Sequence, residues 1–222
     1  MKAAIVPVTP YRQNCSIVWC AETMQGVVID PGGEVDRLVA AAAANGVAVG
    51  KVLLTHGHLD HASGAARLAR ELGVPIEGPH ADDNFLLAAL GQNRTQPGFT
   101  DAEPCAPSRF VVDGDRVSFG QVTLQVLHCP GHTPGHVVYF DDVSKTAFVG
   151  DVLFRGSIGR TDFPRGDHAA LIASITGKLW PLGDVRFVPG HGPSSRFAEE
   201  RRTNPFVRDA VLGNGPASGI PG

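Results

Sequence analysis

The sequence predicts an α/β protein built as a four-layer αββα sandwich, in which two mixed sheets pack face to face and helices cover both outer surfaces. Two observations lead to this fold class. A β-rich stretch followed by a helical stretch occurs twice along the chain, and each sheet or helix must bury its apolar face against another layer. The 222 residues are 43% hydrophobic, which is enough for a substantial core. We therefore expect one domain over residues 1–222, with two similar halves at roughly 1–108 and 109–222.

The first half is predicted to alternate short strands with helices. Its strand candidates are short runs rich in β-branched residues, bounded by Pro, Asn or Gly. Its helix candidates carry apolar residues at helical spacing and stop near a glycine, such as Gly46 or Gly73. The predicted strands are Lys2–Val8, Ser16–Cys20, Gly26–Asp30, Val49–Leu54 and Val74–Glu77, and the predicted helices are Glu34–Asn45, Ala62–Leu72 and Asp82–Leu90.

The second half is predicted to open with a β-hairpin, in which Asp113-Gly114-Asp115 turns Phe110–Val112 back onto Arg116–Phe119. The Pro- and Gly-rich connection before it, Gly91–Ser108, is expected to be the seam between the halves or a flexible flap. The remaining predicted elements are strands Val122–Leu127, Val137–Phe140, Thr146–Val149 and Val185–Val188, helix Asp167–Leu179, and a polar helical tail from Phe197.

Composition narrows the possible partners and the compartment. The net charge of -3 is small and dispersed, which argues against nucleic acid and against an acidic membrane surface. The opening residues hold one lysine and a short apolar run that proline interrupts, which is not the pattern of a signal peptide. The four cysteines show no C-x-x-C pair and do not suggest a disulfide framework. We expect a cytoplasmic protein with reduced thiols, and these features do not predict its oligomeric state.

The most informative segment is Thr-His-Gly-His-Leu-Asp-His, which begins at Thr55 and places His56, His58, Asp60 and His61 within six positions. Imidazole and carboxylate groups bind Zn, Fe and similar divalent metals without any thiolate. Packing does not explain the cluster, because burying so many polar groups without partners is costly. The alternative is a solvated loop that is rich in histidine by chance. The segment therefore predicts a metal site.

Three further ligand-type residues follow predicted strands in the second half. His132 lies in Cys-Pro-Gly-His-Thr-Pro-Gly-His, Asp151 follows a buried strand and a glycine, and His191 lies in Pro-Gly-His-Gly-Pro. A strand can deliver a side chain rigidly to a loop, and glycine lets the backbone turn sharply there. Each residue taken singly could be a turn former or a structural histidine. Together with the first cluster they predict a site for two metal ions.

These residues, in this order and spacing, resemble the metallo-β-lactamase superfamily, whose fold is the four-layer sandwich. Within it the chain is similar to the glyoxalase II (hydroxyacylglutathione hydrolase) group, and especially to its short single-domain bacterial type. The resemblance covers nearly the whole chain. Besides the ligand-type residues, it runs through Gln13-Asn14-Cys15, Asp30-Pro31-Gly32, Gly78-Pro79-His80, the run from Phe154 to Phe163 that contains Gly159-Arg160-Thr161, and the run from Glu200 to Phe206.

The resemblance implies two divalent metal ions per chain. We expect Zn²⁺, although imidazole and carboxylate ligands also accept Fe or Mn. Two ions about 3.5–4 Å apart share a carboxylate and a water, and that water becomes the nucleophile. The resemblance makes Asp60 and Asp151 the catalytic carboxylates, next to the bridging hydroxide. It assigns His56, His58 and His132 to the first metal, Asp60, His61 and His191 to the second, and Asp151 to both.

The implied reaction is hydrolysis of S-lactoylglutathione or a related hydroxyacyl thioester, so the expected partner is a small glutathione conjugate. A rival branch of the same superfamily, the persulfide dioxygenases, holds one iron through the equivalents of His56, His132 and Asp151 alone. That arrangement leaves positions open for oxygen. His136 favours the hydrolase, because the dioxygenases usually differ there. The Gly-Arg-Thr-Asp-Phe run does not separate the two activities.

Two further residues carry weaker predictions. Asp30 precedes Pro-Gly and, by the resemblance, supports the metal ligands without binding the metal; the alternative is a plain turn aspartate. Arg160 stands where full-length glyoxalase II carries a basic residue for the glutathione moiety; the alternative is a surface ion pair with Asp162. The chain ends before the helical C-terminal domain of full-length glyoxalase II, so we expect no separate substrate domain and weaker binding of the glutathione tail.

Overall fold

Two mixed sheets form the centre of the computed structural model, which describes residues 1–93, 95–100, 102–209 and 211–213. The first sheet has the order β1-β2-β3-β4-β5. Its first three strands are antiparallel, whereas β3, β4 and β5 run parallel to one another, because helices carry the chain back between them. The strands are β1 (Lys2–Val8), β2 (Gln13–Trp19), β3 (Gln25–Ile29), β4 (Ala48–Leu53) and β5 (Ile76–Glu77).

The second sheet comes from the second half of the chain and has the order β13-β12-β9-β8-β7-β6. Only one pair in this order, β12 with β9, is parallel; the others are antiparallel. A short separate ribbon, β10 (Leu153–Phe154) with β11 (Ser157–Ile158), follows β9. The sheet strands are β6 (Arg116–Phe119), β7 (Val122–His128), β8 (Val137–Asp141), β9 (Thr146–Gly150), β12 (Arg186–Pro189) and β13 (Ser195–Arg196).

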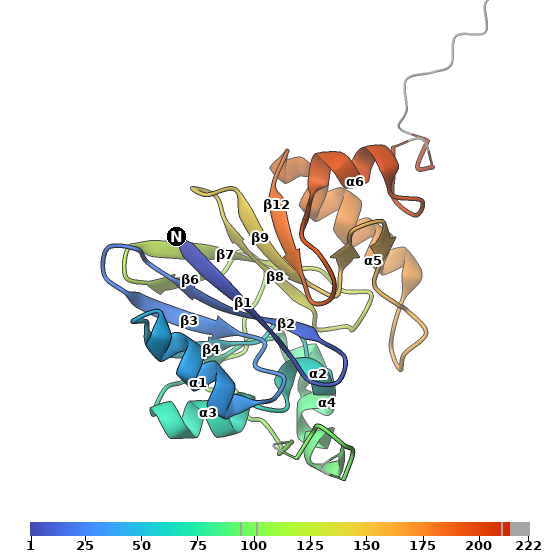
Figure 1. Cartoon of the computed structure of the whole chain (residues 1–222). Helices are drawn as coiled ribbons and strands as arrows, with labels where there is room; N and C mark the ends of the chain where they lie inside the picture. The colour runs from blue at the N-terminus through green and yellow to red at the C-terminus, as the bar shows by residue number, and fades with distance from the viewer. Residues whose placement is uncertain (94, 101, 210, 214–222) are drawn as a thin grey trace, which may run out of the picture.

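Helices cover the outer face of each sheet, as Figure 1 shows, so the predicted four-layer sandwich is confirmed. Against the first sheet lie α1 (Val35–Ala44) and α3 (Ala65–Leu72), which has an apolar stripe of Ala65, Leu68 and Ala69. Against the second sheet lie α5 (His168–Ser174) and α6 (Phe197–Thr203). Short helices fill the connections: α2 (Leu59–Ala62), η1 (Ala81–Asp83), α4 (Asn84–Ala89), η2 (Leu90–Asn93), η3 (Ile175–Leu179) and η4 (Trp180–Leu182).

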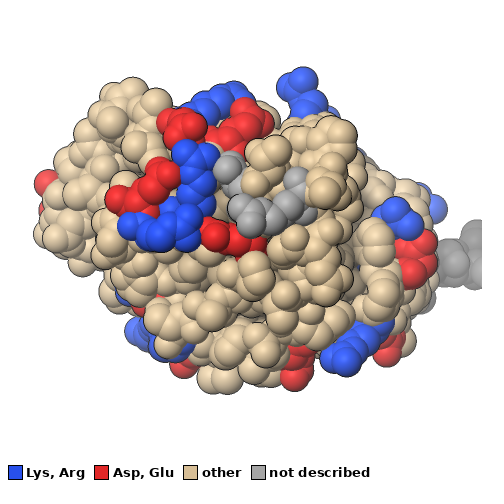
Figure 2. All heavy atoms as spheres, turned by 90° about the horizontal axis from the view of Figure 1, so that it is seen from below, with Lys and Arg blue, Asp and Glu red and all other residues tan. Residues whose placement is uncertain are grey.

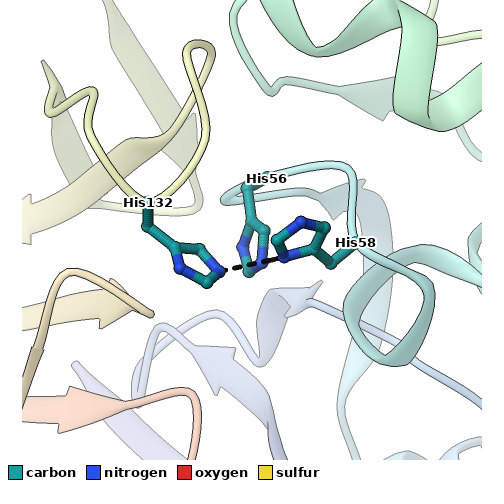
Figure 3. A group of neighbouring side chains, drawn as sticks. All are labelled: His56, His58 and His132. Atoms are coloured by element: carbon teal, nitrogen blue, oxygen red, sulfur yellow. Dashed lines mark hydrogen bonds between the residues drawn. The ribbon is translucent and has the colours of Figure 1, made fainter. Parts of the chain in front are cut away.

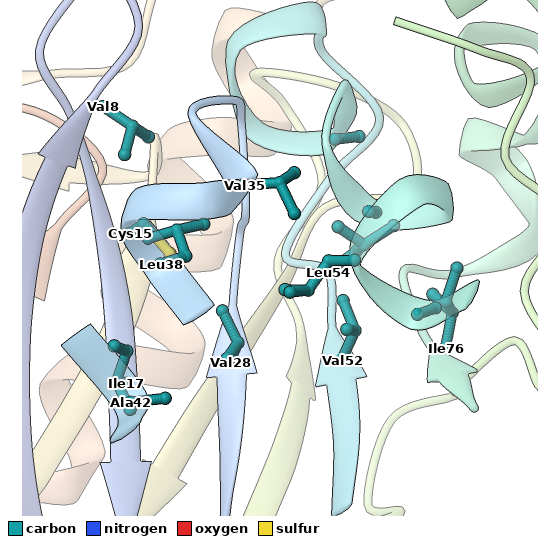
Figure 4. Close-up of a cluster of buried hydrophobic side chains, with 14 of the residues drawn as sticks. Val8, Cys15, Ile17, Val28, Val35, Leu38, Ala42, Val52, Leu54 and Ile76 are labelled. Atoms are coloured by element: carbon teal, nitrogen blue, oxygen red, sulfur yellow. The ribbon is translucent and has the colours of Figure 1, made fainter. Parts of the chain in front are cut away.

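Apolar side chains fill the three spaces between the layers. Figure 4 shows one cluster, in which Ile17 and Val28 of the first sheet pack with Val35 and Leu38 of α1. A second cluster lies between the sheets and includes the fully buried ring of Tyr139. A third lies between the second sheet and its helices. Burying such side chains stabilises the fold by about 1.5–3 kcal/mol each, which makes the strands rigid supports for the loops at their ends.

The predicted hairpin at the start of the second half is wrong. Phe110–Val112, which the structure describes in full, do not form a strand, and β6 pairs with β7 instead. The N–H of Val111 donates to the carbonyl of Pro79, and the N–H of Val112 donates to the side chain of Asp115. Because these backbone donors are already engaged, the segment joins the first half of the chain and cannot pair with β6.

Most predicted elements differ from the observed ones by one to three residues at their ends, and three of them differ in other ways. The helix over Ala62–Leu72 is split into α2 and α3 at Ser63-Gly64, where Gly64 lies too close to Pro31 for a side chain. The strand over Val74–Glu77 is shortened to β5, and the helix over Asp167–Leu179 continues from α5 into a π-helical turn, η3.

The charged side chains are dispersed on the face seen in Figure 2, where Lys and Arg lie beside Asp and Glu. The surface ion pairs include that of Arg70 with Glu103. Within the residues that the structure describes, no helix is long and apolar enough to cross a membrane.

Candidate metal centre

The predicted site residues from both halves of the chain converge where strands of both sheets end. His56 follows β4 and Asp151 follows β9 directly, and His191 follows β12 by one glycine. His132 lies in the turn between β7 and β8. Two of the groups of residues whose ligand atoms lie within 4.8 Å of one another consist only of predicted metal ligands: His56, His58 and His132 form one, and Asp60, His61 and His191 form the other. Asp30 also lies within this distance of His56 and His61.

The first group is a cluster of imidazole nitrogens (Figure 3). Nδ1 of His58 lies 3.1 Å from Nε2 of His56 and 2.9 Å from Nε2 of His132. His56 is completely buried and His132 nearly so. Burial, together with the neighbouring His132, lowers the pKa of His58 to about 3. Burial also lowers the pKa of His56, so the rings of His56 and His58 are neutral and can offer their lone pairs to a cation.

The second group combines one carboxylate with two imidazoles. Nε2 of His191 lies 3.0 Å from Oδ2 of Asp60, and Nε2 of His61 lies 3.8 Å from the same atom. His61 is fully buried. Burial opposes its protonation, but the carboxylates of Asp151 and Asp60 outweigh burial and raise its pKa. A positive charge between these groups is thus electrostatically favoured.

Asp151 lies between the two groups. Its Oδ1 is 3.3 Å from Nε2 of His61, and its Oδ2 is 3.5 Å from Nε2 of His132 and 3.7 Å from Nε2 of His191. Burial opposes ionisation of this carboxyl, yet the neighbouring His61 reverses the effect and lowers its pKa. Asp151 is therefore an anion that faces both groups.

The tautomers of the imidazoles suit metal binding. Nδ1–H of His132 donates to the carbonyl of Arg160 at 2.8 Å, and Nδ1–H of His191 donates to the carbonyl of Tyr11 at 3.2 Å. Nδ1–H of His61 donates to Asp30 at 2.9 Å. In a neutral ring this leaves Nε2 without a proton, so the lone pair points into the site.

Two buried atoms make the fit to a cation specific. Within the described residues, Nε2 of His61 and Oδ1 of Asp151 are buried without a hydrogen-bond partner. Such unpaired groups are costly inside a protein unless a metal or water satisfies them. The donor set of imidazoles and carboxylates is one that Zn²⁺, Fe and Mn share. The residues present therefore fit metal ions in both groups.

Asp30 holds the loop from Thr55 to His61, which carries four of the predicted ligands. Oδ1 of Asp30 accepts the N–H of Thr55 at 2.7 Å, and Oδ2 accepts the Thr55 hydroxyl at 2.6 Å as well as Nδ1–H of His61. Its backbone is left-handed, with φ of 53°, which turns the side chain back toward β4. Asp30 thus fixes the orientation of the His61 ring.

The site opens into a pocket of about 780 Å³. Phe154, Phe163 and Tyr11 give it a largely apolar wall, and Tyr11 packs against Phe99 of the 91–108 connection with ring centroids 5.6 Å apart. That part of the connection therefore supports the pocket wall. The lining residues are Tyr11, His58, Leu59, Asp60, His132, Asp151, Phe154, Arg155, Arg160, Phe163, His191, Gly192 and Pro193.

Two arginines line this pocket, and they differ in the contacts that their side chains make. The Arg160 guanidinium forms two hydrogen bonds with Asp162, at 2.9 and 2.8 Å, and lies 4.4 Å from the centroid of the Phe163 ring. Arg155 is exposed, and the described residues offer it no hydrogen bond or ion pair. The ion pair that was the alternative for Arg160 is therefore present, whereas Arg155, which the sequence did not single out, carries the uncommitted charge.

A further group of ligand-type residues, His80, Asp82 and His128, lies apart from the pocket. The rings of His80 and His128 stack with their centroids 4.3 Å apart and their planes 21° from parallel. Their nitrogen lone pairs consequently run side by side and do not point at a common ion. Nε2–H of His128 also donates to the carbonyl of Pro134. This group is a stacked pair of side chains and does not have the geometry of a metal site.

Comparison with known proteins agrees with this geometry. The model of the metallo-beta-lactamase superfamily matches residues 8–191. Hydroxyacylglutathione hydrolase GloC of Haemophilus influenzae is 42% identical over 209 residues, which are 93% of this chain and 98% of that protein. The structure of TTHA1623 in a di-iron-bound form is 38% identical with a TM-score of 0.82, covering 91% of this chain and 99% of that one. The BLEG-1 B3 metallo-beta-lactamase structure is 31% identical with a TM-score of 0.83, covering 93% and 99%.

Proposed function

The chain belongs to the metallo-beta-lactamase superfamily, and we propose that it is a dinuclear metal-dependent hydrolase that cleaves S-lactoylglutathione or a related hydroxyacyl thioester. The observation that carries the proposal is the place of Asp151 between two complete groups of ligand atoms. The 42% identity to a protein named hydroxyacylglutathione hydrolase supports the thioester as substrate. We further propose that residues 1–222 form one domain.

In this proposal each group of residues holds one ion. His56, His58 and His132 would hold the first, Asp60, His61 and His191 would hold the second, and Asp151 faces both groups. We favour Zn²⁺, and the same donors accept Fe or Mn. When bound, the ions supply Lewis acidity that activates water and polarises the acyl carbonyl.

The residues of the chain provide orientation and a suitable environment. Asp60 and Asp151 are the anions next to the reacting atoms. The pKa of each is lowered, so both carboxylates are ionised at neutral pH. Each can therefore accept a hydrogen bond from a water molecule. Phe154 and Phe163 line the pocket beside them and offer the acyl group an apolar wall. The thiol that leaves has an ordinary pKa of about 8.5, so it departs as a thiolate and needs no separate acid from the chain.

The charge at the pocket fits an anionic thiol conjugate. Glutathione carries free carboxylates, and Arg155 and Arg160 line the pocket that also holds the ligand residues. A guanidinium binds a carboxylate through paired N–H groups. We therefore propose a glutathione thioester as the class of substrate, with both arginines as candidate contacts for its tail.

The alternative activity is that of a persulfide dioxygenase with a single iron. It needs only His56, His132 and Asp151, and Nε2 of His132 lies 3.5 Å from Asp151, close enough for a shared ion. A solved structure similar to this chain carries two irons, which shows that a related site accepts the metal. The second group of ligand residues has no role in that alternative and therefore favours the hydrolase.

A paired assay on one protein separates the two activities. His61 belongs to the second group, so His61→Ala should abolish thioester cleavage and reduce bound metal from about two equivalents to about one. His168→Ala is the matched control, because His168 is exposed and lies outside the pocket. Cleavage of S-lactoylglutathione, oxygen uptake with glutathione persulfide, and metal content are measured on the same samples. Oxygen uptake that persists in His61→Ala with one bound iron would overturn the hydrolase proposal.

A further inference from the structure

Asp83 is a buried carboxylate at the end of η1 with three hydrogen bonds. Its Oδ2 accepts the N–H of Gly57 at 2.9 Å and the hydroxyl of Thr133 at 2.7 Å. Its Oδ1 accepts the N–H of Gly135 at 2.6 Å. The side chain is fully excluded from solvent, so these donors are what stabilises its charge.

The three donors lie on the two loops that carry the first group of ligand residues. Gly57 stands between His56 and His58, and Thr133 directly follows His132. These loops come from different sheets, because one follows β4 and the other joins β7 to β8. A single carboxylate therefore connects the two segments whose separation sets the distances among the three imidazoles.

Close backbone contacts hold Asp83 in this place. A Cβ atom on Gly135 would lie 2.5 Å from the backbone nitrogen of Asp83, and a Cβ atom on Gly57 would lie 2.8 Å from Cβ of Leu86. The N–H of His80 also donates to the carbonyl of Gly135 at 3.0 Å. The absence of side chains at both glycines thus lets the loops approach η1 and α4 at backbone distance.

The segment that carries Asp83 is itself fixed to the core. Leu87 of α4 and Leu90 directly after it are buried, and both belong to the cluster that packs against the first sheet. Asp83 can therefore transmit the position of a rigid element to both loops. A side chain on a mobile segment could not hold two loops at a fixed distance.

Burying a carboxylate is costly, and an apolar residue would fill this place without that cost if packing were its purpose. We propose that Asp83 is a positioning residue, which sets the spacing of His56 and His58 relative to His132 and so the affinity and geometry of the first metal position. The inference rests on the proposed assignment of these histidines as ligands. Asp83 itself belongs neither to the groups of ligand residues nor to the residues that line the pocket.

The test is Asp83→Asn, which keeps the shape of the side chain and replaces one acceptor oxygen by an N–H donor. The Thr133 hydroxyl can rotate to accept from the new amide, but a backbone N–H of Gly57 or Gly135 cannot, so one of the three bonds is lost. We expect a 10–100-fold weaker affinity for the first equivalent of Zn²⁺, measured by competition with a chelator. We also expect a shifted absorption spectrum in the Co²⁺-loaded protein.

Activity adds a second readout. With Zn²⁺ in excess, Asp83→Asn should regain much of its kcat, and KM should stay near the wild-type value because Asp83 does not line the pocket. Ser108→Ala is the matched control, because it too removes a side-chain hydrogen bond, the one that the Ser108 hydroxyl donates to the carbonyl of Ile76. That bond involves neither ligand loop. The control should keep the wild-type affinity and spectrum.

The outcomes distinguish this inference from the proposed function. Wild-type Zn²⁺ affinity and an unchanged Co²⁺ spectrum in Asp83→Asn would overturn the positioning role, whatever the enzyme hydrolyses. A wild-type protein that binds none of Zn²⁺, Fe²⁺ and Mn²⁺ would overturn the proposed function. If Asp83→Asn does not fold, Thr133→Val decides, since it removes one donor and leaves the carboxylate in place. There we expect a several-fold loss of affinity, and an unchanged affinity overturns the inference.

Discussion

The backbone N–H of Asp151 donates a hydrogen bond to Nε2 of His136 at 3.0 Å. The His136 ring is fully buried and stacks on His56, with centroids 4.7 Å apart and planes 19° from parallel. Burial lowers the pKa of His136 well below its ordinary value, and His132 lowers it further. His136 is therefore neutral, with its proton on Nδ1, and it fixes Asp151 through the main chain while supporting His56 through its ring.

Replacing His136 separates these two effects. His136→Leu removes the acceptor for the Asp151 N–H, so we expect a 10–100-fold lower kcat with reduced metal content. His136→Gln keeps a side-chain oxygen that can accept, and it should lose less of both. Thioester turnover and metal analysis on the two purified variants test this. Equal losses in Leu and Gln would contradict a role for the hydrogen bond and leave only the packing of the ring.

The ligand residues of the site could be predicted because the sequence pattern that marks them is local. His56, His58, Asp60 and His61 follow one predicted strand within six positions, so the sequence alone places them on one loop. Strand ends of a layered α/β fold meet at a common edge, which is why the downstream ligand-type residues reach the same place. The layers and the approximate positions of most strands in the two large sheets could be predicted from the same periodicities.

The supporting residues depend on tertiary contacts that the sequence does not reveal. Asp83 is 26 residues from Gly57 and 50 from Thr133, and it stands beside Asp82 at a helix start where either could be the buried one. The hairpin was predicted wrongly for the same reason, because a long-range contact decides the structure of that segment. Val111 donates to Pro79, 32 positions earlier in the numbering, and such long-range pairing leaves no trace in the turn residues that predicted the hairpin.

Metal binding should stabilise the fold, because the folded site offers buried atoms without partners to the ion. With free Zn²⁺ at 100 times the dissociation constant, the free energy of unfolding rises by about 2.7 kcal/mol, which corresponds to a melting temperature about 5–10 °C higher. Thermal unfolding of chelator-treated protein with and without Zn²⁺ measures the shift. Mg²⁺, which prefers oxygen ligands, serves as the control and should give little change. No shift with Zn²⁺ would contradict a preformed site.

Glu77 links β5 to its surroundings through two cations. Its Oε1 accepts from Lys51 at 2.7 Å and its Oε2 accepts from Arg109 at 2.8 Å. Partial burial opposes ionisation of Glu77, but these two bonds outweigh it and lower its pKa. A carboxylate with a lowered pKa stabilises the fold above its ordinary pKa of about 4.5, and the contribution is lost as the pH falls through the folded value.

Glu77→Gln should therefore lower the free energy of unfolding by about 1 kcal/mol at pH 7, and the difference from wild type should shrink below about pH 4.5. Denaturant unfolding of both proteins across this range measures it. Glu199→Gln, which breaks an exposed helical pair with Arg202, is the control and should change stability by no more than about 0.5 kcal/mol. A difference that grows as the pH falls would have the wrong sign for a lowered pKa.

The last prediction concerns how the pocket holds the anionic end of a thioester. Arg160 is bound to Asp162 and stacked on Phe163, whereas the charge of Arg155 is uncommitted within the described residues. A contact to a remote part of the substrate acts about equally in the ground state and the transition state, so its loss raises KM more than it lowers kcat. We expect Arg155→Ala to raise KM for S-lactoylglutathione by about 5–30-fold, which corresponds to about 1–2 kcal/mol for one charge-assisted contact.

Arg160→Ala should raise KM less, because substrate must compete with Asp162 for its guanidinium. Asp162→Ala frees that side chain and is the matched control: it should lower KM if Arg160 can reach the tail. A neutral thioester without the glutathione carboxylates should show none of these effects, since the interaction is between charges. If Arg155→Ala and Arg160→Ala both leave KM unchanged for the glutathione substrate, neither arginine binds the tail, and the broad apolar pocket alone would set a high KM for every acyl thioester.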